Sequence, residues 1–373
     1  MLAAIVGSLI GCSVAPVRHD PRPAASPSPS TSAQRAEPAS LPPVILQAKS
    51  RWVPVHWSDL PGLDTDALHE AWPAWLQSCT RPNKTWAALC PQVRQLANAS
   101  APEQRQWMRQ NLQAYRVESL SQPSEGLLTA YYEPVLNAER QARPGFQVPL
   151  YAPPASLAQR KPWYTRQEMD TQPQARAALR GKELVYLADP VEAMVLHIQG
   201  SGLVNVREPQ GQQRLVRLAF AGTNDQPYKS IGRWLLDQNL VRDASWPGIK
   251  AWIERNPTRL NELLWQNPRV VFFKEEPLPV GGVPPGPKGA QGVPLTAERS
   301  IAVDRGSIPY GTPVWLKSAG PQTTLDRLVL AQDTGSAIVG AVRADYYAGS
   351  GPAAGEMAGR MKQPLQLWAL WPR

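Results

Sequence analysis

Proline is the residue that most limits the folds open to this chain. There are 40 prolines among 373 residues, about twice the usual share of ~5%. The apolar share of 43% is near the globular average, so the chain is expected to fold, with long irregular connections between its elements. Because length divided by about 150 is the usual guide to domain number, we expect two lobes.

Short apolar or alternating runs, broken by Gly, Pro and Asn, predict strands in much of the chain after Pro123. No repeat with a period of about 20–50 residues is visible, which excludes solenoids and propellers. The predicted strands are 127–132, 183–187, 193–198, 213–220, 269–273, 300–303, 312–316, 328–332 and 365–371.

Helical spacing of apolar residues marks three other regions. Residues 52–100 are predicted to be mostly helical, because their apolar residues lie three and four positions apart. A further helix begins at Ala101 and is predicted to continue through Tyr115, and residues 230–264 form a helical interlude. The Pro/Gly-rich residues 276–292 are predicted to be a surface loop.

The N-terminal residues are typical of an exported lipoprotein. Residues 1–10 form an apolar run that precedes Gly-Cys12. This run is shorter than the about 20 residues that span a bilayer, and it has the length of a signal-peptide apolar region. We predict a signal over 1–12, lipidation of Cys12 and a disordered tether over 13–48, rich in Pro, Ala and Ser. The alternative is an apolar N-terminus with a chance cysteine.

Membrane attachment and charge narrow the choice of partners. Ser13 follows Cys12 at the position where inner-membrane lipoproteins commonly carry Asp, so we expect a lipid anchor in the outer membrane, facing the periplasm. The net charge of +9 favours polyanions in general: nucleic acid, anionic lipid or a carboxylate-rich cell wall. Because the basic residues are dispersed and the compartment is exported, we expect no nucleic-acid partner.

Two cysteines remain if Cys12 carries lipid. In an oxidising periplasm, Cys79 and Cys90 are predicted to form a disulfide that closes a short loop, and two free buried thiols are the alternative. The four histidines form no HxxxH or HxH pair, and there is no CxxC. We therefore predict neither a metal nor another cofactor.

Three aspartates in the C-terminal third are the densest chemical signal. Asp304, Asp333 and Asp345 each stand at a predicted strand or loop edge beside small residues. Burial raises the pKa of a carboxyl group, and a neighbouring carboxylate raises it further. An Asp with a pKa of ~3.9 is only about 0.1% protonated at pH 7, so an acid catalyst needs such a site. The alternative for each is a turn cap.

Six segments along the chain form an ordered set that covers roughly residues 50–372. They are Thr129-Ala-Tyr-Tyr-Glu-Pro134, His197-Ile-Gln-Gly-Ser-Gly202, Gly222-Thr-Asn-Asp-Gln-Pro-Tyr-Lys-Ser-Ile-Gly232, Asn267-Pro-Arg-Val-Val-Phe-Phe273, Pro294-Leu-Thr-Ala-Glu-Arg-Ser-Ile-Ala-Val-Asp304 and Gly355-Glu-Met-Ala-Gly-Arg-Met-Lys362. Together they resemble the membrane-bound lytic murein transglycosylase A family. The C-terminal part also resembles a domain named for three aspartates, which Asp304, Asp333 and Asp345 match.

This resemblance implies a mainly β fold with helices, of the α+β class. A double-psi β-barrel domain, with helices in its N-terminal part, would comprise residues 49–128 and 276–373. A second small β-domain would be inserted as residues 129–275. The groove between the two domains would hold a glycan strand.

The resemblance also implies a peptidoglycan lytic exotransglycosylase, which is a lyase. Such an enzyme cleaves the β-1,4 bond between N-acetylmuramic acid and N-acetylglucosamine without water and leaves a 1,6-anhydro product. The family's catalytic aspartate maps to Asp345, which would act first as acid and then as base. Asp333 would hold Asp345 or tune its pKa, and Asp304 would be a structural turn or hydrogen-bonding residue.

Four polar residues in the matched motifs are predicted to bind the substrate. Thr129, Gln199, Ser201 and Tyr228 stand in predicted Gly- or Pro-rich loops and could hydrogen-bond sugar hydroxyl and N-acetyl groups. A plain strand-end role is the alternative for each. The expected partners are peptidoglycan glycan strands and the membrane that holds the lipid anchor. The sequence does not identify protein partners in a cell-wall synthesis complex.

Two rival functions fit parts of the sequence. Asp333-Thr-Gly-Ser336 is the element of aspartic proteases, which need two facing carboxylates. The element occurs once, so such a protease would have to dimerise symmetrically. A non-catalytic peptidoglycan-binding lipoprotein would keep the groove, bind glycan and release no anhydro product.

Overall fold

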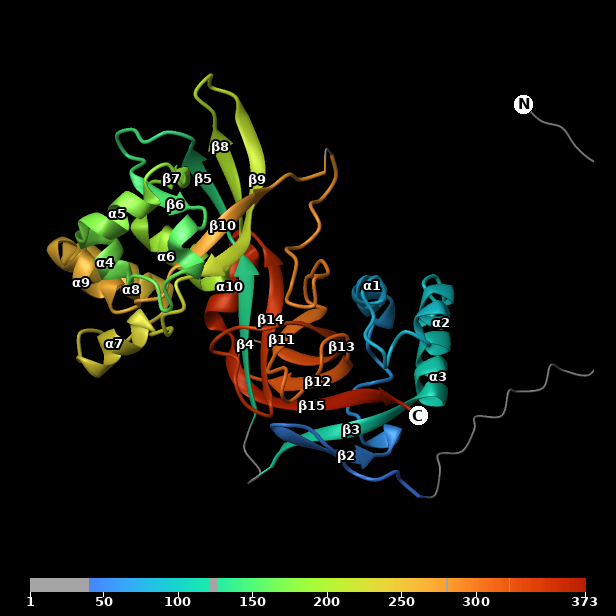
Figure 1. Ribbon diagram of the computed structural model, residues 1–373. Coiled ribbons are helices and arrows are strands. Elements are labelled where there is room, and N and C mark those ends of the chain that lie inside the picture. The colour runs from blue at the N-terminus through green and yellow to red at the C-terminus, as the bar shows by residue number, and fades with distance from the viewer. Residues whose placement is uncertain (1–39, 121–125, 280, 322) are drawn as a thin grey trace, which may run out of the picture. The chain divides into compact units, whose positions relative to one another are not determined.

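The computed structural model describes residues 40–120, 126–279, 281–321 and 323–373 (Figure 1). The predicted signal over 1–12, the lipidated Cys12 and most of the predicted tether lie outside the described residues. At the end of that tether, Ile45–Leu46 forms strand β1. No helix within the described ranges is long and apolar enough to cross a membrane.

Strand β4 closes part of the larger sheet into a barrel. The sheet has the order β1-β2-β3-β15-β12-β13-β11-β14-β4, and β4 also pairs with β15. The strands from β15 to β4 in this order therefore form a closed ring without free edges. The strand bounds are β1 Ile45–Leu46, β2 Ser50–Val55, β3 Leu112–Ser119, β4 Gly126–Glu133, β11 Ser300–Val303, β12 Pro313–Ala319, β13 Thr324–Asp333, β14 Arg343–Ser350 and β15 Lys362–Pro372.

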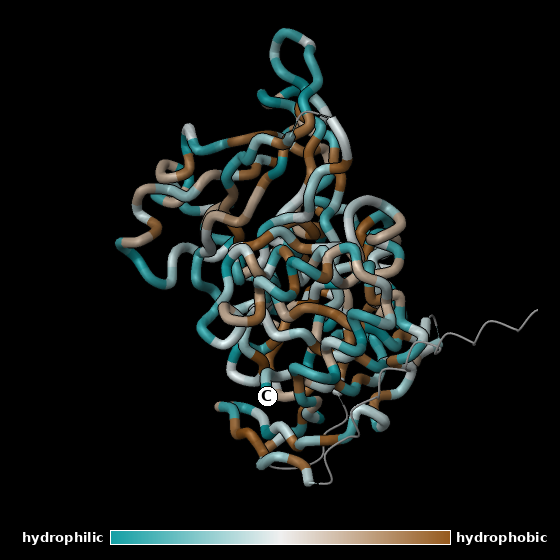
Figure 2. The backbone as a smooth tube through the Cα atoms, turned by 90° about the vertical axis from the view of Figure 1, so that its right-hand side faces the viewer, coloured by the Kyte–Doolittle hydropathy of each residue, from teal (hydrophilic) through white to brown (hydrophobic). Residues whose placement is uncertain are grey.

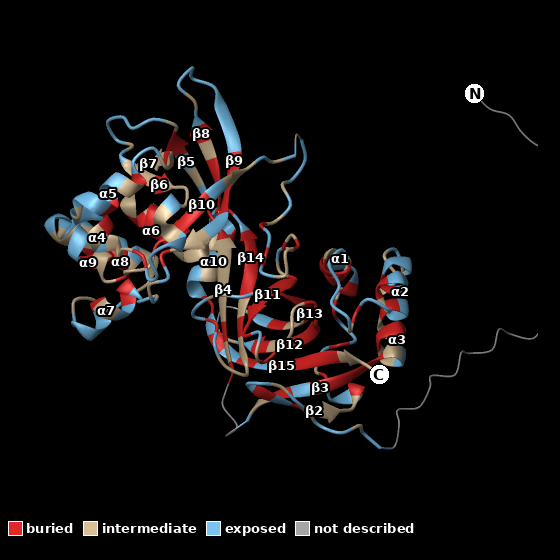
Figure 3. Ribbon diagram, in the orientation of Figure 1, coloured by how far each residue is buried: buried red, intermediate tan, exposed pale blue. Residues whose placement is uncertain are grey.

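Apolar side chains from alternate strand positions fill the barrel interior. Ile301 and Val303 of β11 and Tyr346 of β14 belong to this buried cluster, and the barrel strands other than the mainly tan β4 are largely red in Figure 3. Because successive side chains of a strand point to opposite faces, Ala302 and Asp345 lie on the outer face of the barrel wall.

Tryptophans pack the N-terminal helices against the outside of the barrel. Helices α1 (Leu68–Ser78), α2 (Cys90–Gln95) and α3 (Ala101–Asn111) share one core with residues of β12, β13 and β15. Within it, the rings of Trp72 and Trp75 have centroids 5.1 Å apart. The predicted disulfide between Cys79 and Cys90 is confirmed, and it joins the end of α1 to the start of α2.

A second sheet of six strands has the order β10-β9-β8-β5-β7-β6. Helix α6 covers one face of it, while the tip of the β8–β9 hairpin, at the top of Figure 2, is hydrophilic and exposed. The strand bounds are β5 Val135–Glu139, β6 Val148–Tyr151, β7 Glu183–Leu187, β8 Gly202–Arg207, β9 Gln213–Thr223 and β10 Val271–Glu276. The other helices are α4 Arg166–Thr171, α5 Pro173–Leu179, α6 Pro190–Gln199, α7 Ile231–Asp237, α8 Trp246–Arg255, α9 Leu260–Trp265 and α10 Pro352–Arg360, with short 3-10 turns at Trp57–Asp59, Ala155–Ala158 and Pro257–Arg259.

The predicted fold class is confirmed: the chain is mainly β with helices, and it has a barrel and a second sheet. Strand β4 runs on to Glu133 in the barrel sheet. Residues 129–133, which the sequence placed in the inserted domain, are therefore part of the barrel wall. The second sheet begins directly afterwards, at Val135.

The strand predicted over 193–198 is wrong, because these residues lie in helix α6. Asp189 caps this helix by accepting a hydrogen bond from the Val191 N–H, Pro190 stands in its first turn and Gly200 ends it with a φ of 84°. The helix is buried against the second sheet and also against α7 and α8. A helix that is apolar on several sides shows no amphipathic period, so its sequence looks like a short buried strand.

The helix that begins at Ala101 is shorter than predicted. It ends at Asn111, and residues 112–119 continue as strand β3, paired with β2 and β15. Residues 50–55, which overlap the predicted helical region, form strand β2. Both strands are explained by the barrel sheet, which supplies hydrogen-bonding partners that local spacing does not reveal.

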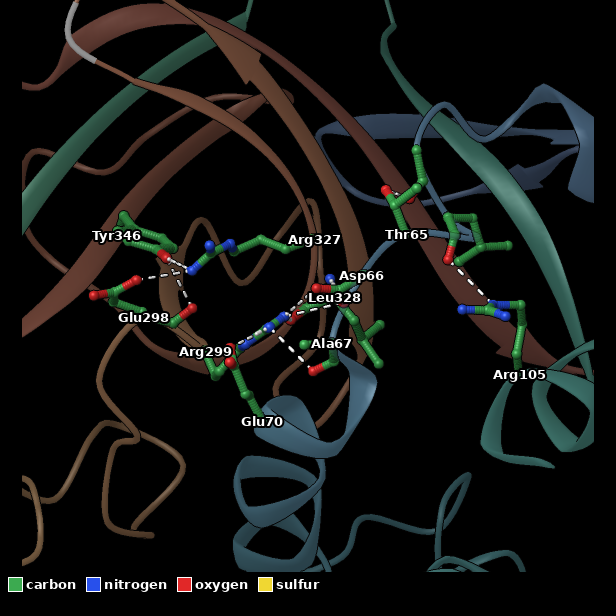
Figure 4. A network of polar contacts seen from close by, with 12 residues as sticks. Thr65, Asp66, Ala67, Glu70, Arg105, Glu298, Arg299, Arg327, Leu328 and Tyr346 are labelled. Atoms are coloured by element: carbon green, nitrogen blue, oxygen red, sulfur yellow. Dashed lines mark hydrogen bonds and ion pairs between the residues drawn. The ribbon is translucent and has the colours of Figure 1, made fainter. Parts of the chain in front are cut away.

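A buried arginine ties α1 to the barrel (Figure 4). The Arg299 side chain is 2% exposed, and its Nη1 donates to both carboxylate oxygens of Asp66 at 3.0 Å. Its Nη2 donates to Glu70 Oε2 at 2.7 Å, and the Leu328 N–H donates to Asp66 Oδ2. The Asp66 carboxylate therefore neutralises a guanidinium that water does not reach.

We predict that Asp66→Ala lowers the free energy of unfolding by about 3–5 kcal/mol, because it leaves a buried charge without its main partner. Denaturant titration followed by tryptophan fluorescence measures this. The control is the exposed neighbour Thr65, where Thr65→Ala should change stability by no more than about 0.5 kcal/mol. Equal effects of the two substitutions would contradict the prediction.

Candidate active site

Strand β11 brings two aspartates to one level of the barrel wall. Ala302 pairs with Asp333 of β13 on one side and with Asp345 of β14 on the other. Neighbouring strands lie about 4.8 Å apart, so the two Cα atoms are about 10 Å apart. A β-bulge shifts the β11–β13 register between Ile301 and Ala302, so Asp333 stands opposite Ala302 although Ala331, two residues before it, faces the barrel interior. Its bond to Tyr131 places the Asp333 carboxyl group on the same outer side as Asp345.

Asp345 is held by a hydroxyl from strand β4. Thr129 is its partner in the β4–β14 pairing, and the Thr129 hydroxyl donates to Asp345 Oδ1. The same hydroxyl accepts a hydrogen bond of 2.8 Å from Arg343 Nη2. Because a hydroxyl has one proton to donate, the bond from Arg343 directs that proton toward Asp345.

Asp333 is held from two other segments. Tyr131 of β4 donates its hydroxyl proton to Asp333 Oδ2 at 2.8 Å, and the Ala290 N–H donates to Oδ1 at 2.9 Å. The Tyr131 ring packs on Tyr347 of β14, with centroids 5.4 Å apart. The two carboxyl groups thus have separate partners and separate orientations.

Both carboxyl groups hold a proton more tightly than usual. Burial raises the pKa of Asp345, although the Thr129 hydrogen bond and the charge of Arg343 partly oppose this. Burial likewise raises the pKa of Asp333; its hydrogen bonds oppose the shift, and the charge of Asp345 adds to it. The site can therefore supply a proton at a pH where an ordinary aspartate is ionised.

Asp304 has other partners than Asp333 and Asp345, and its pKa is lowered rather than raised. Its carboxylate pairs with Lys49 Nζ at 2.9 Å and accepts backbone N–H groups from Gly306 and Gly340. Burial would raise the pKa of Asp304, but these partners outweigh it and lower the pKa. Asp304 is thus an ionised residue that holds two turns together, in agreement with its predicted structural role.

The predicted substrate-binding residues come from different elements, and Thr129 is not in a loop, because it lies inside β4. Gln199 is the last residue of α6, and its Oε1 accepts the Tyr132 N–H at 3.0 Å, next to the site. Ser201 lies between α6 and β8, and Tyr228 lies in the connection that precedes α7. In the described part of the chain, neither of these two donates a hydrogen bond to Asp333 or Asp345.

Sequence reasoning missed three residues of the site. Tyr131 and Arg343 each stand two positions from a predicted residue on the same strand, so the two-residue period of a strand could have indicated them. Ala290 could not be found in this way, since it reaches Asp333 from residues 276–292. The predicted surface loop is confirmed for the described residues after Glu276, which are mostly exposed and form no helix or strand. Ala290 contacts Asp333 from this loop.

No group of three or more His, Cys, Asp or Glu side chains in the described ranges is arranged to hold a metal ion. His197 is buried, and its Nδ1 accepts the Val271 N–H at 3.1 Å. Burial and the charge of Arg166 lower its pKa well below the usual value. It therefore joins α6 to β10 as a neutral side chain.

Two family models match the chain. One is described as "MltA specific insert domain" and matches residues 127–274; the other is described as "3D domain" and matches residues 299–371. The first range covers the second sheet and strand β4, and the second covers β11 to β15.

Two sequence relatives carry the name membrane-bound lytic murein transglycosylase A. The protein from Vibrio cholerae is 34% identical over 254 residues, which are 65% of this chain and 65% of the relative. The protein from Escherichia coli K12 is 34% identical over 277 residues, 70% of each. The chain thus spans about two thirds of the length of these relatives.

Solved structures share the fold. The lytic transglycosylase LtgG of Burkholderia pseudomallei is 41% identical, with a TM-score of 0.60, over 90% of this chain and 99% of that one. MltA from Neisseria gonorrhoeae is 30% identical, with a TM-score of 0.73, over 90% and 96%. E. coli MltA, solved with bound chitohexaose, is 25% identical, with a TM-score of 0.67, over 88% and 93%.

The raised pKa of Asp345 predicts how stability depends on pH. Between the unfolded and the folded pKa, only the unfolded chain loses this proton, so stability falls as pH rises through that window and stays lower above it. Asp345→Asn should therefore raise Tm at pH 7, by about 2–4 °C per kcal/mol, and change it little at pH 3. Calorimetry at both pH values tests this, with Asp237→Asn on the exposed side of α7 as control; a lower Tm for Asp345→Asn at pH 7 would contradict it.

Proposed function

The chain belongs to the membrane-bound lytic murein transglycosylase A family, and from this premise we propose that it cleaves the glycan strands of peptidoglycan. A relative solved with chitohexaose supports the choice of a glycan as ligand. We place the strand along the outer barrel wall beside the second sheet, with the bond to be cut at Asp345.

The observation that carries this proposal is the environment of Asp345. Its carboxyl group is partly buried, its pKa is raised, and Thr129 orients it on the outer face of the barrel. General acid catalysis needs a group that keeps its proton near the working pH and then releases it. Asp345 meets this requirement.

One carboxyl group suffices for the proposed reaction. Protonated Asp345 gives its proton to the glycosidic oxygen, and the bond between this oxygen and C1 of the muramyl residue breaks with the electron pair leaving on the oxygen. The 6-hydroxyl of the same residue then attacks the oxocarbenium-like C1, and the Asp345 carboxylate takes the hydroxyl proton. The product is a 1,6-anhydro sugar, and no water is consumed.

Asp333 serves this chemistry without touching the scissile bond. The two carboxyl groups disfavour ionising together, because the charge of Asp345 raises the pKa of Asp333. Tyr131 and Ala290 keep the Asp333 carboxyl group in place. We assign Gln199 to sugar binding, because it contacts the backbone of β4 beside the site.

We also propose attachment to the outer membrane through a lipid on Cys12. The names of the relatives describe them as membrane-bound. The sequence before residue 40 supports a signal, a lipidated cysteine and a tether. A tether of this composition would let the barrel reach glycan strands in the periplasm.

The products of purified peptidoglycan test the proposed reaction. The wild-type protein should release muropeptides ending in 1,6-anhydromuramic acid, about 18 Da lighter than hydrolysed ones by loss of one water. Asp345→Asn should lower the rate by about 10²–10⁴-fold, the usual contribution of a general acid, and Asp333→Asn should lower it less.

Mass spectrometry of the released products decides between the outcomes. The matched control is Asp304→Asn, which should keep turnover in the folded fraction, because Asp304 binds Lys49 away from the site. Reducing-end products would indicate a hydrolase that admits water. Binding without any product would favour the non-catalytic lipoprotein.

The Thr129 hydroxyl should set the pH range of the reaction. A hydrogen bond to a charged group contributes about 1.5–3 kcal/mol, and one pKa unit corresponds to about 1.4 kcal/mol. Thr129→Val should therefore move the alkaline limb of the pH–rate profile up by about 1–2 units, while Thr129→Ser, which keeps the hydroxyl, should not. An unchanged profile in Thr129→Val would show that Thr129 does not hold the acid.

A further inference from the structure

A fully buried ion pair joins the two sheets where strand β4 leaves the barrel. Glu133 is the last residue of β4, and its side chain is 0% exposed; Arg217, from the middle of β9, is 5% exposed. Arg217 Nε donates to Glu133 Oε1 at 2.6 Å and Nη2 donates to Oε2 at 3.0 Å. Ser350 at the end of β14 also donates to Glu133 Oε2, at 3.0 Å.

The same guanidinium holds the loop between β10 and β11. Arg217 Nη2 donates to the Pro285 carbonyl oxygen at 2.5 Å. Five residues later in this loop, the Ala290 N–H donates to Asp333 Oδ1. The segment 285–290 is therefore tied to the buried ion pair at one end and to the candidate active site at the other. Between these ends it forms backbone hydrogen bonds with Val293 and Leu295.

Glycines let this segment lie close against the barrel. A Cβ at Gly286 would come 2.2 Å from the Leu295 carbonyl oxygen, and a Cβ at Gly289 would come 2.5 Å from that of Gln332. Real Cβ atoms are essentially never found at such distances, so the backbone can take this path only with glycine at both positions. The backbone path between Pro285 and Ala290 is thus narrowly restricted. A displacement of Pro285 would therefore also displace Ala290.

We propose that Glu133 and Arg217 are positioning residues, which hold segment 285–290 so that the Ala290 N–H orients Asp333 beside Asp345. The proposal rests on the proposed function for its kinetic consequence. Neither residue touches the substrate in this scheme. The two parallel hydrogen bonds between Arg217 and Glu133 have a fixed geometry. Through them and segment 285–290, the second sheet is connected to the Asp333 carboxyl group.

The main variant is Arg217→Lys, which keeps the buried positive charge and loses the forked geometry. We expect kcat to fall about ten- to a hundredfold, as for a small misplacement of a catalytic group, with little change in KM. The pH–rate profile should move in the same direction as in Ala290→Pro, which removes the N–H donor directly. Glu133→Gln is the second variant, and it should act in the same way.

A double variant distinguishes a positioning role of Arg217 from a merely structural one. If Arg217 acts through Ala290, the double variant Arg217→Lys/Ala290→Pro should be no slower than the slower single variant. The matched control is Arg140→Lys, since Arg140 forms a similar fork with Glu208, at 2.8 and 3.0 Å, in the second sheet. It should keep both the rate and the pH profile. Additive losses, or an unchanged profile in Arg217→Lys, would overturn the proposal.

Amide hydrogen exchange at Ala290 gives a readout that does not depend on activity. In the full chain without substrate, Arg217→Lys should raise exchange at this amide at least about tenfold, because its anchor is lost, and Arg140→Lys should not. If the wild type cuts no glycan but exchange responds, the positioning stands and the proposed function fails. If the wild type cuts glycan and exchange is unchanged in Arg217→Lys, the positioning is wrong.

Discussion

The pairing of strand β4 with two partners is the constraint on which the rest of the structure depends. Its bonds to β15 close the barrel, and its bonds to β14 set the register that places Thr129 opposite Asp345. A shift by one residue would turn Thr129 and Tyr131 into the barrel interior. It would also move Glu133 away from Arg217, so closure, acid site and inter-sheet contact share one register.

Placing the carboxyl groups on the outer wall reconciles two opposing requirements. In the proposed reaction, the acid needs enough burial to raise its pKa, and the glycan strand must still reach it. The outer wall satisfies both because the loop carrying Ala290 and the rings of Tyr131 and Tyr347 cover the aspartates only in part. The barrel interior, filled with apolar side chains, would give burial without access.

Sequence patterns predicted two strands with the bounds that they have in the structure. Residues 300–303 and 183–187 were predicted with the bounds that β11 and β7 have. The same reasoning mistook α6 for a strand, because burial on several sides removes the helical period. It also missed β3, since that strand depends on pairing with β2 and β15, which lie far away in the sequence.

By itself, the sequence determined the family and the identity of the three aspartates, because these depend on residue types in order along the chain, whereas the structure decided that Cys79 and Cys90 are joined. Only the tertiary structure decided which aspartates meet: Asp333 and Asp345 flank Ala302, whereas Asp304 pairs with Lys49. It likewise brought Ala290 to Asp333 from the loop after β10, and Arg217 of β9 to Glu133. Such contacts follow from strand register and chain closure, which are properties of long-range pairing that no local stretch of residues encodes.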